Sequence, residues 1–474
     1  MNFPIKTSCF LYNFSFVIFL ASCSVSKQIS KQANTILLSD TTISTGHIGI
    51  SIYEPATNTY WYNYNADKYF IPASNTKLFT LYAGMKYLGD SLVGLRYIKK
   101  DFNSIYILPT GDPTFLNSEF KNQPVFNYFK KNKKDLFFLT VNSKFEHLGN
   151  GWAWNDYNDD YMVERSVFPI YGNVFTFSKR DNRVLSIPYL KPQDFSFHIM
   201  GIKFYDSIRY SVPIDSGFLK RNYASNRMDI IETGNKFVSQ KIPFHIDYSE
   251  ITKWIRDTIA ASAFNTFKIY AELQEGTYVY KEKEKQIQDL FRPEINNASF
   301  EIIHSQPSDS LFKPMMHRSD NFFAEQTLLM ASNEHLGYMS DEKIIDTLLK
   351  SDLKDVPQKP KWVDGSGLSR YNLFTPQSFV YILNKIKNEV GLERIKNILP
   401  TGGTGTLASY FKKDSSFIYA KTGTLSNNCA LSGYLITKKG KFLVFSVLAN
   451  NYQTGATPVR KAVEHFLEAI REKY

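Results

Sequence analysis

The chain has 474 residues, of which 43% are apolar and 15% aromatic, and its formal net charge is +11. This length predicts two or three domains, the apolar fraction is enough for packed cores, and the aromatic content favours β structure over a strongly helical protein. The Lys and Arg residues are scattered and form no nucleic-acid motif, so we expect no nucleic-acid partner, and three Cys exclude a disulfide framework.

The first residues predict export. An apolar run, FLYNFSFVIFLA, follows Lys6 and is too short to span a bilayer comfortably, but it has the length of a signal-peptide core. Its last two residues and the following Ser22-Cys23 resemble the lipobox of bacterial lipoproteins. We therefore expect residues 1–22 to be a signal peptide and residues 23–34 to be a polar tether lipidated at Cys23. The alternative is a simple signal peptide in which Cys23 is incidental.

The next two elements differ in their periodicity. HIGISIYE and TYWYNYNA, joined by the turn residues PATN, predict a β-hairpin. Pro72 then precedes a helix that Gly89 stops. The apolar residues at helical spacing in this helix are Leu78, Leu81, Tyr82, Met85 and Leu88.

The rest of the chain divides into a β-rich stretch and a mixed stretch. From about residue 96 to 290, runs such as DLFFLTV, FSFHIMGIKF and FKIYAELQEGTYVYK predict strands. Helical patterning returns with NFFAEQTLLMA, and SGYLIT, KKGK and FLVFSVLAN predict a second hairpin. The last segment predicts an amphipathic helix whose apolar face carries Val459, Val463, Phe466 and Ile470.

The first candidate for chemistry lies at the start of the helix after Pro72. Ser74 and Lys77 stand three residues apart, so a hydroxyl and an amine share one helix face. A lysine whose pKa is lowered by burial or by positive charge can act as the base that activates a serine. By itself a Ser-x-x-Lys match is common and is usually solvated helix surface.

Two further candidates lie far along the chain. Ser319-Asp320-Asn321 stands just before a helix, and in a turn its first and third side chains can face one cavity while Asp320 turns away. Its other interpretation is an ordinary N-cap. Lys421-Thr422-Gly423-Thr424 ends a predicted strand, where a cation and a hydroxyl can hold a carboxylate and Gly423 lets a peptide lie close.

Ser-x-x-Lys, Ser-Asp-Asn and Lys-Thr-Gly in this order are the trio of penicillin-binding proteins and class A β-lactamases. The segments PASNTKLFT, GDPTFL, GWAWND, SDNFFAEQ, VDGSGLSRYNLFTP, TGGTGTL, AKTGTL and LSGYL extend the resemblance over most of the mature chain. The chain resembles the D-alanyl-D-alanine carboxypeptidase and endopeptidase family, the low-molecular-mass penicillin-binding proteins with inserted domains. One departure is ILPTGDP, where relatives often carry a run of glycines, and this concerns only local loop shape.

The resemblance implies an α+β fold with a penicillin-binding, transpeptidase-like catalytic domain, an antiparallel sheet flanked by helices, and a large β-rich insertion. The catalytic domain would comprise residues 35–95 and 291–474. The inserted β-rich domain would comprise residues 96–175 and 250–290, with a smaller domain nested in it at residues 176–249.

The resemblance also implies roles for the site residues. Ser74 would be the nucleophile, Lys77 its base, and Ser319 a proton relay toward the leaving amine. The substrate-binding residues would be Asn321 for the amide, Lys421 and Thr422 for the terminal carboxylate, and Gly423 and Thr424 along the strand. The backbone amides of Ser74 and Thr424 would form the oxyanion hole, and the charge of Lys421 would lower the pKa of Lys77. No metal or other cofactor is implied.

The implied function is hydrolysis of D-alanyl bonds in peptidoglycan stem peptides through an ester on Ser74, which β-lactams would also acylate. The protein would be periplasmic or otherwise in the cell envelope, held to a membrane by its lipid. A β-lactamase and a non-catalytic penicillin-binding sensor are the alternatives. The long insertion favours a large cell-wall substrate and argues against a β-lactamase. The intact trio argues against a non-catalytic sensor. The choice between carboxypeptidase and endopeptidase stays open.

Overall fold

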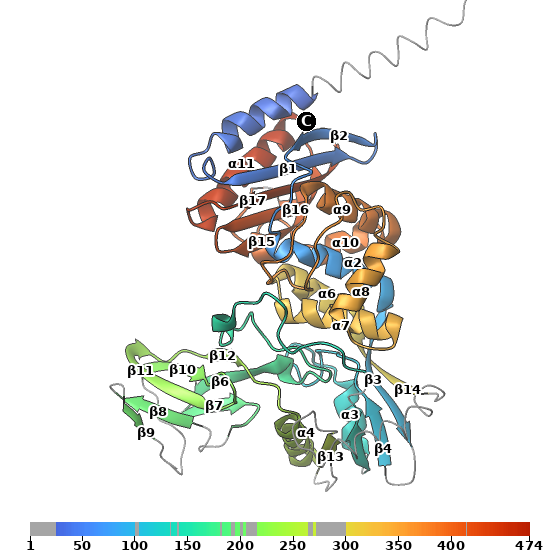
Figure 1. Ribbon diagram of the computed structural model, residues 1–474, viewed down its shortest axis with the longest axis vertical. Helices are drawn as coiled ribbons and strands as arrows, with labels where there is room; N and C mark the ends of the chain where they lie inside the picture. The colour runs from blue at the N-terminus through green and yellow to red at the C-terminus, as the bar shows by residue number, and fades with distance from the viewer. Residues whose placement is uncertain are drawn as a thin grey trace, which may run out of the picture.

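The computed structural model describes residues 25–99, 104–132, 134–139, 142–180, 183–190, 195–199, 202–204, 216–263, 269–271, 300–413 and 415–474. Two lobes follow one another along the long axis of the molecule (Figure 1). We call residues 25–90 and 308–474 the terminal lobe, because both ends of the chain form it, and residues 91–307 the middle lobe.

The terminal lobe is built on one antiparallel sheet of five strands. Their order is β15 (Ile418–Leu425), β16 (Asn428–Ile436), β17 (Phe442–Asn450), β1 (His47–Glu54) and β2 (Thr59–Tyr64). Both predicted hairpins are confirmed, as β1 with β2 and β16 with β17. Pairing of β1 with β17 joins the two ends of the chain in one sheet, and β15 is an edge strand within the described chain.

Helices cover both faces of this sheet (Figure 1). One face packs against α11 (Ala456–Lys473), whose predicted apolar side chains at 459, 463, 466 and 470 are buried. The helices that contribute to the core on the other face are α2 (Lys77–Tyr87), α6 (Ser308–His317), α7 (Asn321–Leu336), α8 (Asp341–Lys350), α9 (Pro376–Val390) and α10 (Leu392–Ile398). Buried side chains on both faces make this a three-layer lobe.

The segment expected to be a polar tether differs in the structure. Residues 25–38 are helical and end in η1 (Ala33–Leu38), and they pack against α11. Ile29, Ala33 and Leu37 recur at intervals of four residues, which places them on one face, and all three are fully buried. The predicted signal peptide and Cys23 lie outside the described residues.

The described residues of the middle lobe form three sheets, in agreement with its predicted β-rich character. The first has the strand order β13 (Ile269–Ala271), β5 (Asp135–Phe138), β4 (Ser104–Leu108), β3 (Ser91–Lys99) and β14 (Glu301–Pro307). The second has the order β10 (Ser216–Arg221), β11 (Met228–Lys236), β8 (Phe195–Ile199) and β9 (Ile202–Phe204). The third has the order β12 (Gln240–Pro243), β6 (Val174–Arg180) and β7 (Arg183–Ile187). Most of the segment FKIYAELQEGTYVYK lies outside the described residues.

Two helices also lie in this β-rich stretch, α3 (Pro124–Lys131) and α4 (Tyr248–Ala263). Helix α4 buries Ile251, Trp254 and Ile255 at helical spacing. Aromatic and β-branched residues favour strands, so the composition of this segment predicted β structure. Tertiary packing instead favours the helical period of its apolar residues. The exact domain boundaries stay a prediction, but β3 pairs with β14, so the chain enters and leaves the middle lobe through neighbouring strands.

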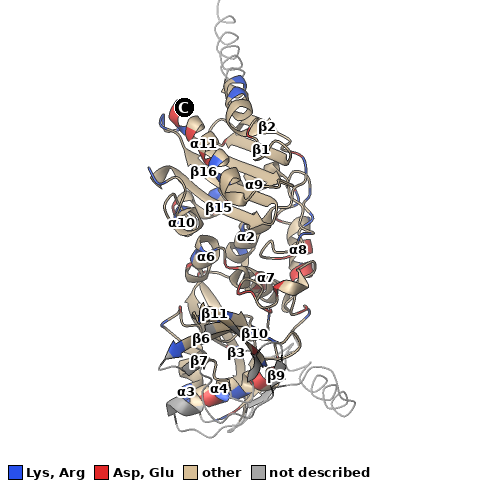
Figure 2. Cartoon of the chain, turned by 90° about the vertical axis from the view of Figure 1, so that its left-hand side faces the viewer, with Lys and Arg blue, Asp and Glu red and all other residues tan. Residues whose placement is uncertain are grey.

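Short helical turns complete the described structure: η2 (Ala73–Thr76), η3 (Trp154–Asp156), η4 (Tyr171–Asn173), η6 (Gly405–Leu407) and η7 (Ser415–Phe417). Basic and acidic residues are distributed over both lobes (Figure 2). A search of the described helices for a span long and apolar enough to cross a membrane finds none.

Candidate active site

The first motif forms a hydrogen-bonded centre at the start of α2. Ser74 lies in η2, and Lys77 is the first residue of α2 and is fully buried. The Lys77 Nζ donates to Ser74 Oγ at 3.0 Å, to Asn321 Oδ1 at 2.6 Å and to the Ser366 carbonyl at 2.7 Å. All three ammonium donors are therefore engaged, and Lys77 links the first motif to the second.

The pKa of Lys77 is shifted toward the neutral amine. Burial lowers this pKa to about 8, while the negative charges of Asp364, Glu325 and Asp320 oppose the shift. We expected the field of Lys421 to lower the pKa, but the removal of the Lys77 amine from water is the main cause. A lysine with this pKa supplies far more neutral amine near neutral pH than an exposed lysine does.

The second motif combines both interpretations that the sequence allowed. Asp320 is the N-cap of α7 and accepts a hydrogen bond from the Phe323 amide at 2.9 Å. Ser319, with a φ of +62°, and Asn321 both line a cavity next to Ser74. The Asn321 amide also donates from Nδ2 to the Tyr161 carbonyl at 2.9 Å, which ties the motif to the middle lobe.

The third motif brings a second buried lysine to the same place. Lys421 is fully buried on β15 and donates to Ser319 Oγ at 2.9 Å and to the Thr422 carbonyl at 2.6 Å. Burial and the positive charges of Lys77 and Arg460 lower the pKa of Lys421 well below its ordinary value. Both lysines thus donate hydrogen bonds to the second motif, Lys77 to Asn321 and Lys421 to Ser319.

The packing around residue 423 explains why a glycine stands there. A Cβ at this position would lie 2.5 Å from the Pro72 carbonyl oxygen and 3.1 Å from the Asn75 amide nitrogen. A side chain would therefore push β15 away from the turn that carries Ser74. The close approach of β15 to the turn that carries Ser74 therefore requires a glycine here, and the expected role of Gly423 beside a bound peptide stays a prediction.

The three motifs meet at a cavity of about 450 Å³. The predicted residues that line it are Ser74, Ser319, Asn321, Thr422 and Thr424, while the buried lysines and Gly423 lie behind its wall. Charged residues that the sequence analysis did not select also line it: Asp156, Arg370 and Arg460. The cavity therefore presents hydroxyls and an amide beside cationic groups.

The loop that holds Lys77 was not selected from the sequence. Asp364 accepts hydrogen bonds from the Gly367 amide at 2.8 Å and the Ser369 amide at 2.7 Å, which turns the Ser366 carbonyl toward Lys77. Gly367 has a φ of +82°, and a Cβ there would lie 1.9 Å from the Ala73 carbonyl oxygen. In the sequence, the Asp among glycines and serines in VDGSGLSR could have indicated a tight turn held by the Asp364 carboxylate.

A buried ion cluster supports this loop from the other side. The Glu325 carboxylate accepts from the Ser366 amide at 2.7 Å and lies 3.4 Å from Arg165, which also pairs with Asp341 at 2.5 Å. Burial and the nearby Asp364 raise the pKa of Glu325 to about 7. A lone Glu within the apolar run NFFAEQTLLMA was the signal for it, because a buried acid needs a partner.

Comparison with known proteins gives a consistent family match. The model of the D-Ala-D-Ala carboxypeptidase 3 (S13) family matches residues 30–184 and 292–470. The D-alanyl-D-alanine carboxypeptidase DacB of Haemophilus influenzae is 24% identical over 83% of this chain and 83% of its own. The penicillin-sensitive carboxypeptidase A of Dictyostelium discoideum is 24% identical over 88% of this chain and 85% of its own.

Solved structures agree on the fold. Penicillin binding protein 4 (dacB) from Haemophilus influenzae superposes with a TM-score of 0.65, at 20% identity, over 93% of this chain and 98% of that one. The same protein complexed with a novel β-lactam gives a TM-score of 0.62, at 18% identity, over 94% and 99% of the two chains. The expected α+β penicillin-binding fold with a large insertion is therefore confirmed.

Proposed function

Because this chain belongs to the D-Ala-D-Ala carboxypeptidase 3 (S13) family, we propose that it is a serine peptidase that hydrolyses D-alanyl peptide bonds in peptidoglycan through an acyl-enzyme on Ser74. β-Lactams acylate the same serine. One observation carries the proposal: the Lys77 amine lies within hydrogen-bonding distance of both the Ser74 hydroxyl and the Asn321 amide oxygen. Ser74 and Asn321 line the cavity at which all three motifs meet.

In the acylation step, the neutral Lys77 amine takes the proton of the Ser74 hydroxyl as the oxygen attacks the D-alanyl carbonyl carbon. The 3.0 Å separation of these two atoms and the lowered pKa of Lys77 support this role. The backbone amides of Ser74 and Thr424 stabilise the oxyanion. The intermediate then expels the amine and leaves an ester on Ser74.

The leaving amine needs a proton, and Ser319 is the relay that supplies it. Its Oγ accepts from Lys421 at 2.9 Å, which leaves its own proton free to donate toward the cavity. Lys77 passes the proton it took from Ser74 to Ser319, which replaces the proton lost to the amine and leaves Lys77 neutral again. Water then attacks the ester, Lys77 takes the water's proton and returns it to Ser74 Oγ as the ester bond breaks, and the carboxylic acid product leaves.

Substrate binding falls to the residues around this centre. Asn321 holds the substrate amide, while Lys421, Thr422 and Thr424 bind the terminal carboxylate, with Gly423 keeping β15 close to Ser74. An extended peptide lying along β15 would use its outer edge beyond Tyr419 and Ala420, where residues 400 and 401 already bridge to the strand.

The protein acts in the cell envelope, and Cys23 carries the lipid that holds it at a membrane. Leu20-Ala21-Ser22 before Cys23 supports this assignment. The helical segment of residues 25–38 lies at the end of the molecule opposite the middle lobe (Figure 1). Mass spectrometry of the mature N-terminus tests the anchor, because an unmodified Cys23 or a different first residue would contradict it.

Labelling with a fluorescent penicillin tests the nucleophile. The wild-type protein should retain the label, and Ser74→Ala should lose it while its circular dichroism stays that of the folded protein. Equal labelling of Ser74→Ala at the same site would disprove the role of Ser74. A β-lactamase would instead release the opened drug rapidly and leave little label.

Digestion of purified peptidoglycan identifies the bond. Release of D-alanine indicates cleavage of the terminal bond, and conversion of cross-linked to monomeric muropeptides indicates cleavage between stems. Both activities should disappear in Ser74→Ala, and release of neither product by the wild type would overturn the proposed function.

A further inference from the structure

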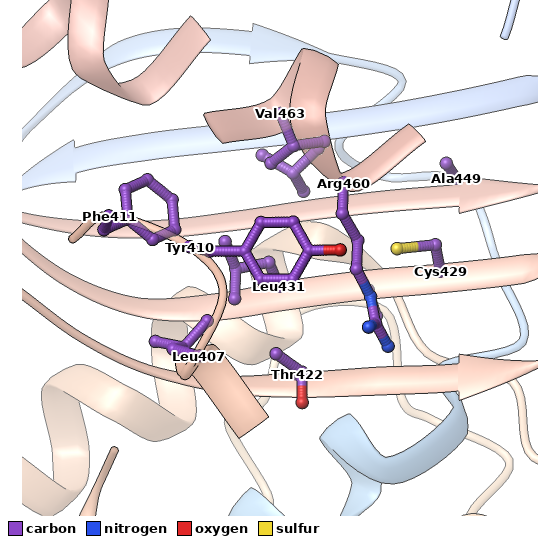
Figure 3. A pocket seen from close by; sticks show the side chains of 11 residues that line it. Leu407, Tyr410, Phe411, Thr422, Cys429, Leu431, Ala449, Arg460 and Val463 are labelled. Atoms are coloured by element: carbon purple, nitrogen blue, oxygen red, sulfur yellow. The ribbon is translucent and has the colours of Figure 1, made fainter. Parts of the chain in front are cut away.

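Two arginines, Arg370 and Arg460, line the cavity, and Arg460 contacts the third motif. Arg460 lies near the start of α11, and its side chain runs beside Cys429 toward Thr422 on β15 (Figure 3). The Arg460 Nη2 donates to the Thr424 hydroxyl, and the guanidinium lies 5.8 Å from the Tyr410 ring centroid. Arg460 lines both the active-site cavity and a small apolar cavity beside it.

This arginine keeps hydrogen-bonding capacity in reserve. A guanidinium has five N–H donors in a fixed fork that matches a carboxylate, and Arg460 uses one of them on the Thr424 hydroxyl and lies beside the Cys429 thiol. No acidic side chain among the described residues forms an ion pair with Arg460. Its charge is therefore available to an anion that enters the cavity.

The contact with Thr424 also orients a donor toward the cavity. A hydroxyl has one proton and two acceptor positions, so Thr424, by accepting from Arg460, keeps its own proton to donate. Ser319 is in the same state, because its Oγ accepts from Lys421. Two hydroxyls, each accepting a hydrogen bond from a basic side chain, thus line the same cavity.

The charge balance favours the arginine as the fixed cation. Lys421 is fully buried beside two other cations, and its pKa is well below the ordinary value, whereas a guanidinium stays charged in proteins. Arg370 also lines the cavity and donates to the Ser426 carbonyl, whereas Arg460 carries its permanent positive charge to Thr424, where the third motif would meet a carboxylate.

We infer that Arg460, acting with the Thr424 hydroxyl, is a specificity-determining residue that binds the free C-terminal carboxylate of the substrate. The inference rests on the proposed function and adds a residue from α11 to the carboxylate site. A purely structural arginine, which only packs on Tyr410, is the competing explanation.

Lys461 provides a matched control for that explanation. It is the next residue on α11, lies 5.0 Å from the same Tyr410 ring and pairs with Glu464 at 2.6 Å. It does not line the active-site cavity. Lys461→Gln therefore removes one positive charge and one contact with Tyr410 without removing a group from the site.

The experiment measures the acylation of Ser74 by a stem-peptide analogue that ends in a free carboxylate and by the same peptide with an amidated C-terminus. Arg460→Gln should lower the rate constant for the free carboxylate about 10- to 100-fold and that for the amide less than about threefold. Arg460→Lys, which keeps the charge but loses the fork, should fall between wild type and Arg460→Gln. Lys461→Gln should change neither rate by more than about twofold.

Equal losses on the two peptides, or no loss on the free carboxylate, would overturn the inference. If Arg460→Gln does not fold, Arg460→Lys decides, because an unchanged ratio of the two rate constants in that variant contradicts carboxylate recognition by the fork. The proposed function fails separately, if the wild type itself is not acylated at Ser74.

Discussion

The two lobes each bury a cluster of ionisable groups, but the clusters are built in opposite ways. In the middle lobe, the Glu164 carboxylate lies 3.1 Å from His245 and 3.5 Å from Arg221, and accepts from the Ile246 amide at 2.9 Å. In the terminal lobe, Lys77 and Lys421 are both buried beside hydroxyl, amide and carbonyl groups, and within the described chain no carboxylate is among their hydrogen-bond partners.

This difference appears in the pKa values. Burial by itself would raise the pKa of Glu164, but the hydrogen bond and charge of His245 outweigh it, and the pKa is lowered. Burial instead lowers the pKa of both lysines, and no hydrogen-bonded counter-ion reverses the shift. Matched charge keeps an ion in its ordinary state, whereas unmatched burial produces a reactive amine.

The largest expected effect is that of Lys77→Ala on acylation. Loss of the base should lower the rate constant for penicillin labelling of Ser74 by about 100- to 10,000-fold. Lys86→Ala is the control on the same helix, because Lys86 is a partly exposed residue paired with Asp352 at 2.9 Å, and it should change the rate less than about twofold. A folded Lys77→Ala variant that labels at more than about a tenth of the wild-type rate would contradict the assignment.

Glu164→Gln should affect stability rather than chemistry. It leaves the Arg221 guanidinium, 1% exposed, without its counter-ion, so the free energy of unfolding should fall by about 3–5 kcal/mol in urea titrations. The acylation rate per folded molecule should stay within about threefold. Glu342→Gln, which breaks an exposed pair, should cost less than about 1 kcal/mol. A large loss of acylation in folded Glu164→Gln would mean that the two clusters are coupled.

Lys421→Ala should discriminate between substrates. Removing its amine should lower acylation by peptides with a free C-terminal carboxylate by about 1.5–3 kcal/mol in activation free energy. The loss on amidated peptides should be smaller. The same loss on both kinds of peptide would assign Lys421 to structure or proton transfer, and the role in carboxylate binding would be wrong.

The pH dependence of the wild type tests the same lysine without a substitution. The proposed base is the neutral amine of Lys77, whose pKa is about 8, so acylation should rise as pH increases through 8 and level off above it. Well below this pKa the rate should fall about tenfold per pH unit. Stopped-flow labelling at pH values where circular dichroism is constant measures this profile. A flat profile from about pH 6 to about pH 9 would exclude Lys77 as a base with this pKa.

Local sequence was enough to predict much of this protein. The spacing of Ser74 and Lys77, the Ser-Asp-Asn turn and Lys-Thr-Gly each depend on a few neighbouring residues, as do the two hairpins and the amphipathic helix α11. Periodicity and turn chemistry act over one or two turns of chain, so they can be recognised from the sequence. Their common cavity required the family resemblance in addition.

Composition concealed two features that packing later decided. Helix α4 has strand-favouring residues but buries them at helical spacing, and the expected tether at residues 25–34 is part of a helix against α11. Each of these helices is stable only when packing against a partner surface removes its apolar face from water.

The sequence by itself determined the identity and order of the reactive groups, and the tertiary structure decided their protonation and their neighbours. Ser366, Glu325 and Arg460 reach the site from segments far from Ser74 in the chain. Their contacts depend on pairing of distant strands and on packing of α7 and α11, which no local pattern specifies. The lowered pKa of Lys77 has the same origin, because burial is a property of the folded lobe and not of the motif.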